Sequence, residues 1–158
     1  MKNHYTVEEN VLQLIALLKA HGVRKVVASP GTTNITFVGS VQNDPEFQVF
    51  SCIDERSACY MACGMAEESG EPVALSCTGA TAARNYPSGL TEAFYRHLPI
   101  VAITSSQYFG KVGQLNAQFT DRNVIQRDIA KISVQIPYPN NADDRWSNNV
   151  KINTALLE

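Results

Sequence analysis

The sequence predicts an α/β fold with three layers, in which a mainly parallel sheet lies between helices, as a single domain. Short β-rich runs alternate with stretches whose apolar residues recur at helical spacing, and this alternation is typical of parallel sheets with crossover helices. The run at residues 99–104 is apolar at almost every position, as expected for a parallel strand covered on both faces. A chain of 158 residues is long enough to bury a core of its own.

The elements follow in order from the same patterns. Thr6 and Glu9 form a capping box that predicts the start of the first helix, and Gly22 predicts its end. We expect strands at residues 23–29, 48–53, 73–77, 99–104 and 132–136. We expect further helices at residues 35–42, 55–69, about 90–97, 123–130 and 143–157.

Three details complete this expectation. Pro87 and Gly89 are expected to interrupt the start of the helix that ends near His97. Residues 110–121 are polar with few apolar anchors, which predicts a mobile loop. The last helix is predicted to have a partial packing face made of Trp146, Val150, Ile152, Ala155 and Leu156.

Composition argues against several classes of function. Hydrophobic residues make up 44% and charged residues 18%, which is ordinary for a globular domain. A net charge of −2 and the lack of a Lys/Arg cluster argue against a nucleic-acid surface. No apolar run is long enough to span a membrane, and the first residues contain no signal-peptide core. We therefore expect a cytoplasmic protein.

The cysteines are interpreted as small buried thiols. They are Cys52, Cys59, Cys63 and Cys77. The three histidines are scattered along the chain and do not supply the further ligands that a metal site needs. No metal ligand is therefore assigned in this chain.

Glu55 is the residue on which the functional interpretation depends. It follows a β-rich run and opens a helix that Gly70 ends, so it falls at a strand-to-helix junction. In open α/β sheets such junctions line the ligand crevice. Taken alone, Glu55 also fits a purely structural role, because acidic residues in the first turn of a helix are favoured by the helix dipole.

The surrounding residues add a family resemblance. Residues 54–58 (Asp-Glu-Arg-Ser-Ala), the small-residue helix after them, and residues 71–79 resemble the pyrimidine-binding domain of thiamine-diphosphate enzymes. This family includes acetolactate synthase, the 2-oxo acid decarboxylases and the menaquinone enzyme that makes 2-succinyl-5-enolpyruvyl-6-hydroxy-3-cyclohexene-1-carboxylate, to which the Asp-Glu-Arg-Ser-Ala run is most similar. The resemblance covers the chain from about Val7 onward, which implies one such domain over residues 1–158.

The resemblance implies a catalytic role for Glu55. In the family, a Glu at this position hydrogen-bonds N1′ of the cofactor's aminopyrimidine and favours its imino tautomer. The 4′-imino nitrogen then removes the C2 proton of the thiazolium ring, so the cofactor supplies the carbanion and the protein handles one proton. Gln has no proton to exchange, and Asp is too short to reach.

Further site residues follow from the same resemblance. The family's Pro-Gly loop lies against the cofactor or substrate, which implies that Pro30 and Gly31 contact the cofactor and that Thr32 and Thr33 face the substrate. The menaquinone enzyme usually carries an Arg shortly after this Pro-Gly. Here threonines and Asn34 replace it, which removes a carboxylate clamp and argues against that enzyme's own substrates.

Two later segments complete the implied cofactor site. Thr78 and Gly79 match the family's Thr-Ser-Gly stretch, whose hydroxyl and backbone groups face the pyrimidine. Asn85 matches an Asn just inside the following helix, with the register open by one residue. Family members place a loop Gln over the site; Gln118 is preferred over Gln114 here, and a solvated loop amide fits either residue as well.

The resemblance also implies partners. The family holds Mg²⁺ and the diphosphate through a Gly-Asp-Gly motif on another domain, and this chain contains no such motif. We therefore expect the diphosphate-binding domain to come from another subunit or from the rest of a longer chain. A homo-oligomer and a small 2-oxo acid substrate are implied as well, and the chain alone is expected to be inactive.

Two other functions fit the fold. One is a non-catalytic dimerisation or regulatory module that retains the fold. The other is a flavodoxin-like nucleotide or flavin binder, against which the lack of a Gly-rich phosphate loop after the first strand argues.

Overall fold

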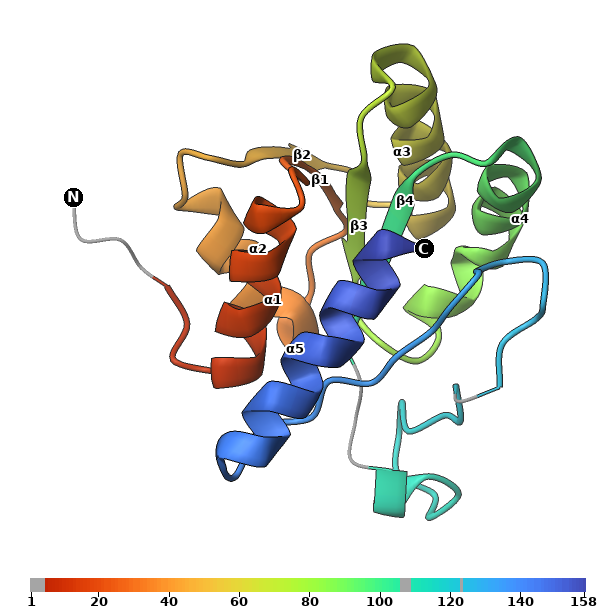
Figure 1. Cartoon of the computed structure of the whole chain (residues 1–158). Coiled ribbons are helices and arrows are strands. Elements are labelled where there is room, and N and C mark those ends of the chain that lie inside the picture. Colours follow the sequence, from red (N-terminus) through yellow and green to blue (C-terminus); the bar gives the residue numbers. More distant parts are fainter. Residues whose placement is uncertain (1–4, 106–108, 123) are drawn as a thin grey trace.

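The computed structural model describes residues 5–105, 109–122 and 124–158 (Figure 1). The strands are β1 Lys25–Ala28, β2 Gln48–Ser51, β3 Val73–Cys77 and β4 Ile100–Thr104. The helices are α1 Glu9–Ala20, α2 Ile35–Gln42, α3 Glu55–Ser69, α4 Pro87–Arg96 and α5 Ala142–Leu157. Three short 3-10 helices are added, η1 Thr32–Asn34, η2 Ala82–Asn85 and η3 Phe109–Lys111.

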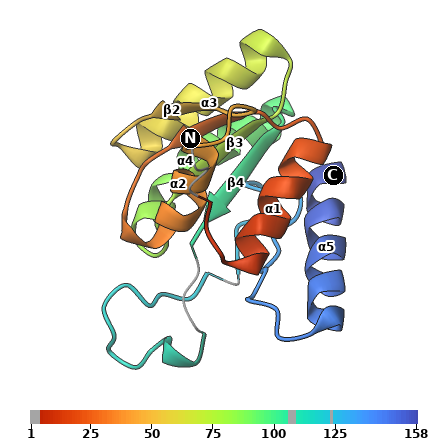
Figure 2. The same ribbon diagram turned by 90° about the vertical axis from the view of Figure 1, so that its left-hand side faces the viewer.

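The described strands form one parallel sheet in the order β2-β1-β3-β4. Figures 1 and 2 show α1, α2 and α5 on one face of the sheet and α3 and α4 on the other. The predicted α/β fold with three layers is thereby confirmed. Because all strands run the same way, their carboxyl ends lie together at one edge, where the loops after β1, β3 and β4 meet.

Two hydrophobic cores cover the two faces of the sheet. Leu18, Val26 and Ala74 belong to the core under α1, α2 and α5. Val27 and Leu75, which alternate with them along the strands, belong to the core under α3 and α4. Every residue of β3 is buried, since this strand is central and covered on both faces.

Several predicted elements agree with the structure to the residue. These are α2, α3 and β3. The start of α3 is secured by Asp54, whose side chain accepts a hydrogen bond of 2.7 Å from the backbone N–H of Ser57. Gly70 ends α3 in the left-handed conformation, as its sequence position predicts.

The prediction of a capping box at Thr6 is wrong. Helix α1 begins at Glu9, and Thr6 lies before it, where its hydroxyl accepts the Glu8 N–H at 3.1 Å. The backbone N–H of Thr6 also donates to Ser40 Oγ at 3.0 Å, so this segment is bound to α2 rather than continuing the helix. Pro87 does not interrupt α4 either: it is the first residue of that helix, where its missing N–H leaves no hydrogen bond unmade.

The predictions of a fifth strand at residues 132–136 and of a helix at residues 123–130 are also wrong within the described residues. Residues 127–129 form a turn, the rest of 124–130 is not helical, and Asn123 lies outside the described part of the chain. Residues 132–136 form no strand; instead the Ile136 carbonyl accepts a hydrogen bond of 3.0 Å from Asn10 of α1. Consequently β4 is the edge of the described sheet, and Ala102 in its middle is exposed, contrary to the expectation of a strand covered on both faces.

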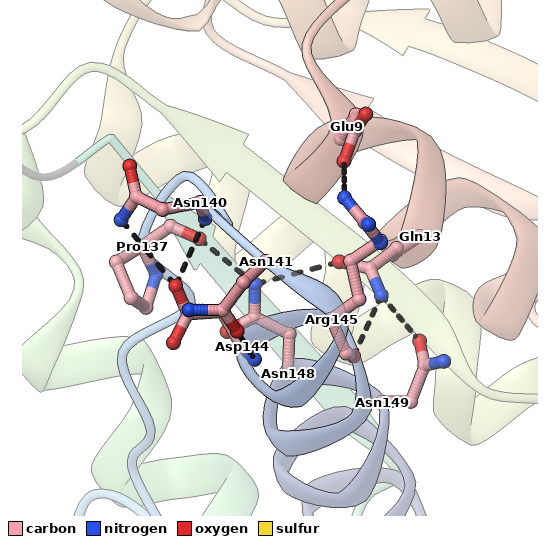
Figure 3. A network of polar contacts seen from close by, with 9 residues as sticks. All are labelled: Glu9, Gln13, Pro137, Asn140, Asn141, Asp144, Arg145, Asn148 and Asn149. Carbon is pink, nitrogen blue, oxygen red and sulfur yellow. Dashed lines mark hydrogen bonds and ion pairs between the residues drawn. The ribbon is translucent and has the colours of Figure 1, made fainter.

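Helix α5 packs against α1 through a polar network (Figure 3). Gln13 of α1 donates hydrogen bonds of 2.8 Å to the Arg145 carbonyl and to Asn149 Oδ1, and Arg145 forms an ion pair with Glu9 at 3.0 Å. Buried Asn148 donates to the Pro137 carbonyl at 2.8 Å and so holds the chain that leads into α5.

This orientation of α5 corrects part of the predicted packing face. Ile152 is buried, and Ala155 and Leu156 are half-buried. Trp146 and Val150 are 69% and 44% exposed. Ile152 and Leu156 thus pack into the core under α1 and α2, while Trp146 and Val150 face away from it. Among the described residues, no helix combines the length and apolar character needed to cross a membrane.

Asp44 gives the fold a pH-dependent component of stability. It is buried, forms an ion pair with Lys19 and accepts a hydrogen bond from Tyr5. Burial alone would raise the pKa of Asp44, but the Lys19 and Tyr5 hydrogen bonds hold it below its usual range. A carboxyl with a lowered pKa stabilises the fold above its unfolded pKa of about 3.9, and this contribution is lost as the pH falls through the folded value.

Asp44→Asn is therefore expected to lower the free energy of unfolding by about 1.5–3 kcal/mol at neutral pH, because it weakens hydrogen bonds to a charged group. The difference from the wild type should shrink as the pH falls below about 4. Urea denaturation at several pH values measures it, with exposed Asp143→Asn as a control. A difference that stays constant down to acid pH would contradict this assignment.

Candidate functional site

The candidate site lies at the carboxyl edge of the sheet, around Glu55. Glu55 is the first residue of α3, directly after β2, and its side chain is half-buried. Among the described residues, its carboxylate has neither a hydrogen bond nor an ion pair, which leaves it available to a ligand. Its charge acts on two buried groups, Cys77 at the end of β3 and Tyr86 before α4.

Both of these neighbours are neutral at physiological pH. Burial, together with a smaller effect of the negative charge of Glu55, raises the pKa of the Cys77 thiol to about 11. Burial likewise raises the pKa of Tyr86, whose side chain is 1% exposed. The Tyr86 hydroxyl faces the Cys77 thiol, which is a weak hydrogen-bond partner, and meets no other partner in the described part of the chain. It is thus a buried polar atom beside the candidate site.

The loop after β1 contacts the loop after β3. The Gly31 N–H donates to Asn34 Oδ1 at 2.9 Å, and buried Asn34 donates in turn to the Ser29 carbonyl and to Ser76 Oγ, both at 3.2 Å. A Cβ atom at Gly31 would lie well under 3.0 Å from the methyl carbon Cγ2 of Thr78. The two predicted glycine loops are therefore in direct contact, as one continuous rim.

This contact can be tested by a pair of substitutions. Gly31→Ala is expected to lower the free energy of unfolding by about 1–2 kcal/mol, because the added methyl overlaps Thr78 Cγ2. Gly31 has an extended backbone (φ −166°) that alanine also adopts, so the cost is steric. Thr78→Ser deletes the overlapping methyl and should restore most of the loss in the double variant.

A thermodynamic cycle of the two single variants and the double variant, measured by chemical denaturation, isolates the coupling between these two positions. Additive effects of the two substitutions would show that the loops are not in contact.

A third loop, residues 109–122, folds against the loop after β3. Thr81 Oγ1 donates to Gln118 Oε1 at 3.1 Å, and Arg84 donates to the Asp121 carbonyl at 3.0 Å. Gln114 is exposed, and its carbonyl accepts a hydrogen bond from the Asn116 side chain within the same loop. Gln118, the preferred residue of the two, thus contacts the loop after β3, and its role in the site stays a prediction.

The other predicted site residues lie at the periphery. Pro30, Thr32 and Thr33 are exposed at the rim, and the Thr33 carbonyl accepts a hydrogen bond of 2.7 Å from Ser105 Oγ. Asn85 is exposed as well, with its amide 3.5 Å from the Thr81 carbonyl. These residues line the rim without meeting Glu55 directly.

Sequence reasoning missed Tyr86, Arg84 and Arg122. The guanidinium of Arg122 lies against Gly79, 3.0 Å from the place of a Cβ atom there. Tyr86 is the residue before a helix-starting Pro, and its aromatic ring at a helix start was a usable indication of burial. Nothing in the local pattern marks Arg122, which reaches the site only because its loop folds back.

A scan against family models supplies the identification. Residues 11–134 match the thiamine pyrophosphate enzyme, N-terminal TPP binding domain. The chain belongs to the thiamine pyrophosphate enzyme family. Thiamine pyrophosphate is another name for thiamine diphosphate, so the resemblance to that family is confirmed.

Related proteins support this membership. The chain is 38% identical to a 2-succinyl-5-enolpyruvyl-6-hydroxy-3-cyclohexene-1-carboxylate synthase of Phocaeicola vulgatus over 154 residues, which is 98% of this chain and 28% of that protein. A thiamine diphosphate-dependent 4-hydroxybenzoylformate decarboxylase of Rhodococcus jostii RHA1 has a TM-score of 0.72 and 25% identity over 93% of this chain and 27% of its own.

The fold also matches benzoylformate decarboxylase of Polynucleobacter necessarius, with a TM-score of 0.61 at 20% identity over 70% of this chain and 20% of that one. This chain of the thiamine pyrophosphate enzyme family thus spans about a quarter of the length of these two relatives.

The residues present fit the pyrimidine end of the cofactor. A partly exposed acid without a partner, at the junction of β2 and α3, suits a hydrogen bond to a ring nitrogen. No group of three or more His, Cys, Asp or Glu side chains able to hold a metal ion occurs among the residues that the structure describes.

Proposed function

We propose that this chain is the pyrimidine-binding part of a thiamine-diphosphate-dependent carboligase or decarboxylase that acts on a 2-oxo acid. The observation that supports it most is the carboxylate of Glu55, which lies at the carboxyl edge of the sheet with no partner among the described residues. Membership of the thiamine pyrophosphate enzyme family supports the choice of cofactor.

Glu55 is proposed to hold and exchange one proton at N1′ of the aminopyrimidine and thereby to favour its imino tautomer. Thiamine diphosphate, when bound, supplies the nucleophilic carbon that attacks the 2-oxo acid. The half-buried position of Glu55 limits the water around its carboxyl group, and the buried neighbours Cys77 and Tyr86 remain uncharged.

The rim residues are proposed to position the cofactor and the substrate. Gly31, Thr78 and Gly79 are proposed to line the cofactor site from the place where their two loops touch. Pro30 and Asn85 are proposed at the periphery of the cofactor site, and Thr32 and Thr33 on the side of the substrate. Gln118 lies over the loop after β3 through its bond to Thr81.

The diphosphate and Mg²⁺ are proposed to be bound by another domain, either of a partner subunit or of a longer chain. The relatives are several times longer than this chain, so other domains exist in the family. The pairing of two such halves makes a homo-oligomer the expected assembly. The chain described here is then one half of a composite site.

Calorimetry with thiamine diphosphate and Mg²⁺ tests this proposal. The chain alone is expected to bind the cofactor weakly or not at all, because the diphosphate contacts are missing. Adding the diphosphate-binding half should produce tight binding and consumption of a 2-oxo acid. Submicromolar binding by the chain alone would contradict the composite site. Tight binding of the complete assembly without any turnover would instead favour the non-catalytic module.

A further inference from the structure

Ser105, directly after β4, is the residue at which the loops of the carboxyl edge meet. Its hydroxyl donates a hydrogen bond of 2.7 Å to the Thr33 carbonyl in the loop after β1. Its own carbonyl oxygen accepts a hydrogen bond from Arg122 and lies well under 3.0 Å from the place of a Cβ atom at Gly79, in the loop after β3. A single residue therefore joins the loops after β1 and β3 to the segment that ends at Arg122.

Arg122 holds the end of segment 109–122 against β4. Its guanidinium donates to Thr104 Oγ1 at 3.0 Å as well as to the Ser105 carbonyl, and its side chain is half-buried. The planar fork of a guanidinium reaches two oxygens at once, which fixes its orientation. Hydrogen bonds from a charged donor are also stronger than those between neutral groups. Arg122 is thus a firm anchor for this segment.

The rest of segment 109–122 needs such an anchor. Val112 and Phe119 are half-buried, whereas its tip, residues 113–118, is exposed. Leu115 and Gln118 have positive φ angles of 57° and 68°, a backbone conformation that residues other than glycine seldom adopt. Such a conformation persists only where surrounding contacts hold it. The exposed bond between Thr81 and Gln118 is one such contact, and the Arg122 fork is the more buried one.

We propose that Arg122 and Ser105 are positioning residues that hold Gln118 and Thr33 in place at the rim of the site and so set the affinity for the 2-oxo acid. The inference rests on the proposed function, and it adds residues that act without touching the substrate. Arg122 fixes the segment that carries Gln118, and the Ser105 hydroxyl fixes the loop that carries Thr33. A rim that is ordered before binding spares the substrate the entropic cost of ordering it.

Trypsin cleavage of the chain after exposed Lys111, followed by mass spectrometry, measures the release of segment 109–122. Arg122→Gln is expected to speed this cleavage severalfold, because a segment without its anchor opens locally. Arg122→Lys keeps the charge but not the fork, so an intermediate rate is expected. Ser105→Ala keeps the carbonyl that Arg122 binds and should be cleaved like the wild type. Arg127→Gln, at an exposed arginine, is the matched control and should also match the wild type.

Steady-state kinetics of the assembled enzyme test the effect on the substrate. Arg122→Gln should raise KM for the 2-oxo acid about tenfold, the size expected when hydrogen bonds from a charged group are lost, with little change in kcat. Ser105→Ala should raise KM severalfold, and Ser105→Thr, which keeps the hydroxyl, should restore it. A role in stability alone would leave KM unchanged.

The proposal is overturned if Arg122→Gln is cleaved after Lys111 no faster than the wild type, or if both variants lose kcat while KM stays the same. The cleavage rates depend on neither cofactor nor substrate. If the assembled enzyme converts no 2-oxo acid, the proposed function fails, while these rates still decide whether Arg122 anchors the segment.

Discussion

Glu55→Gln is expected to lower thiamine-diphosphate-dependent turnover about 10²- to 10⁴-fold in the assembled enzyme, the range that general acid–base groups contribute. Glutamine keeps the size of the side chain and its hydrogen-bonding oxygen, but it has no proton to exchange with the ring nitrogen. Binding of the cofactor should change far less than turnover. Exchange of the cofactor's C2–H for deuterium, followed by NMR, reads the proton-transfer step without reference to the substrate.

A matched control is available on the same helix. Glu68→Gln changes an exposed acid near the far end of α3 and should leave both turnover and deuterium exchange unchanged. Both variants should fold, because an exposed or half-exposed Glu at a helix surface contributes at most about 1 kcal/mol. Turnover of Glu55→Gln close to that of the wild type would remove the assigned role.

Gly79→Ala is expected to lower the free energy of unfolding by about 3 kcal/mol, at the upper end of the range for overpacking. A Cβ atom at Gly79 would lie well under 3.0 Å from the Ser105 carbonyl oxygen, which is backbone and cannot rotate away. It would also meet the Arg122 guanidinium. The loops after β3 and β4 must therefore separate, and the rim of the site would open.

Gly64→Ala is the matched control, with an effect of opposite sign. Gly64 lies inside α3 on the exposed side, and a Cβ atom there would meet nothing within 4 Å. Alanine in a helix interior is more favourable than glycine by about 0.5–1 kcal/mol, so this variant should be more stable than the wild type. Urea denaturation of both variants compares them, and equal effects would show that the close approach at Gly79 is absent.

The local patterns were sufficient for the elements that flank Glu55. Helix α3 has small residues at helical spacing and a Gly after its last residue, and β3 is an apolar run bounded by Pro72 and Thr78. In both cases the tertiary environment agrees with the local preference. The contact of the Gly31 and Thr78 loops also follows from parallel topology, which brings the carboxyl ends of neighbouring strands together.

The local patterns failed between β4 and α5. Residues 132–136 have the alternation of a strand, but Asn10 takes the Ile136 carbonyl and Asn148 takes the Pro137 carbonyl. Side-chain amides from two helices thus replace the bonds of a strand ladder. In α5, Arg145 contacts Gln13 and Glu9 of α1, and the neighbouring Trp146 stays exposed. The residue pattern within either segment therefore could not predict these contacts, because their partners lie far away in the chain.

The sequence by itself determined the α/β class, the place of Glu55 at a strand-to-helix junction and the family to which the chain is related, because each depends on residues that are neighbours in the chain. Only the tertiary structure decided that Gln118 meets Thr81, that Arg84 meets Asp121 and that Arg122 lies against Gly79. The pairs Thr81–Gln118 and Arg84–Asp121 are each 37 positions apart. The physical reason is that such contacts depend on the pairing of β3 with β4 and on how the loop after β4 folds back over their ends. The spacing of apolar residues within one segment predicts neither.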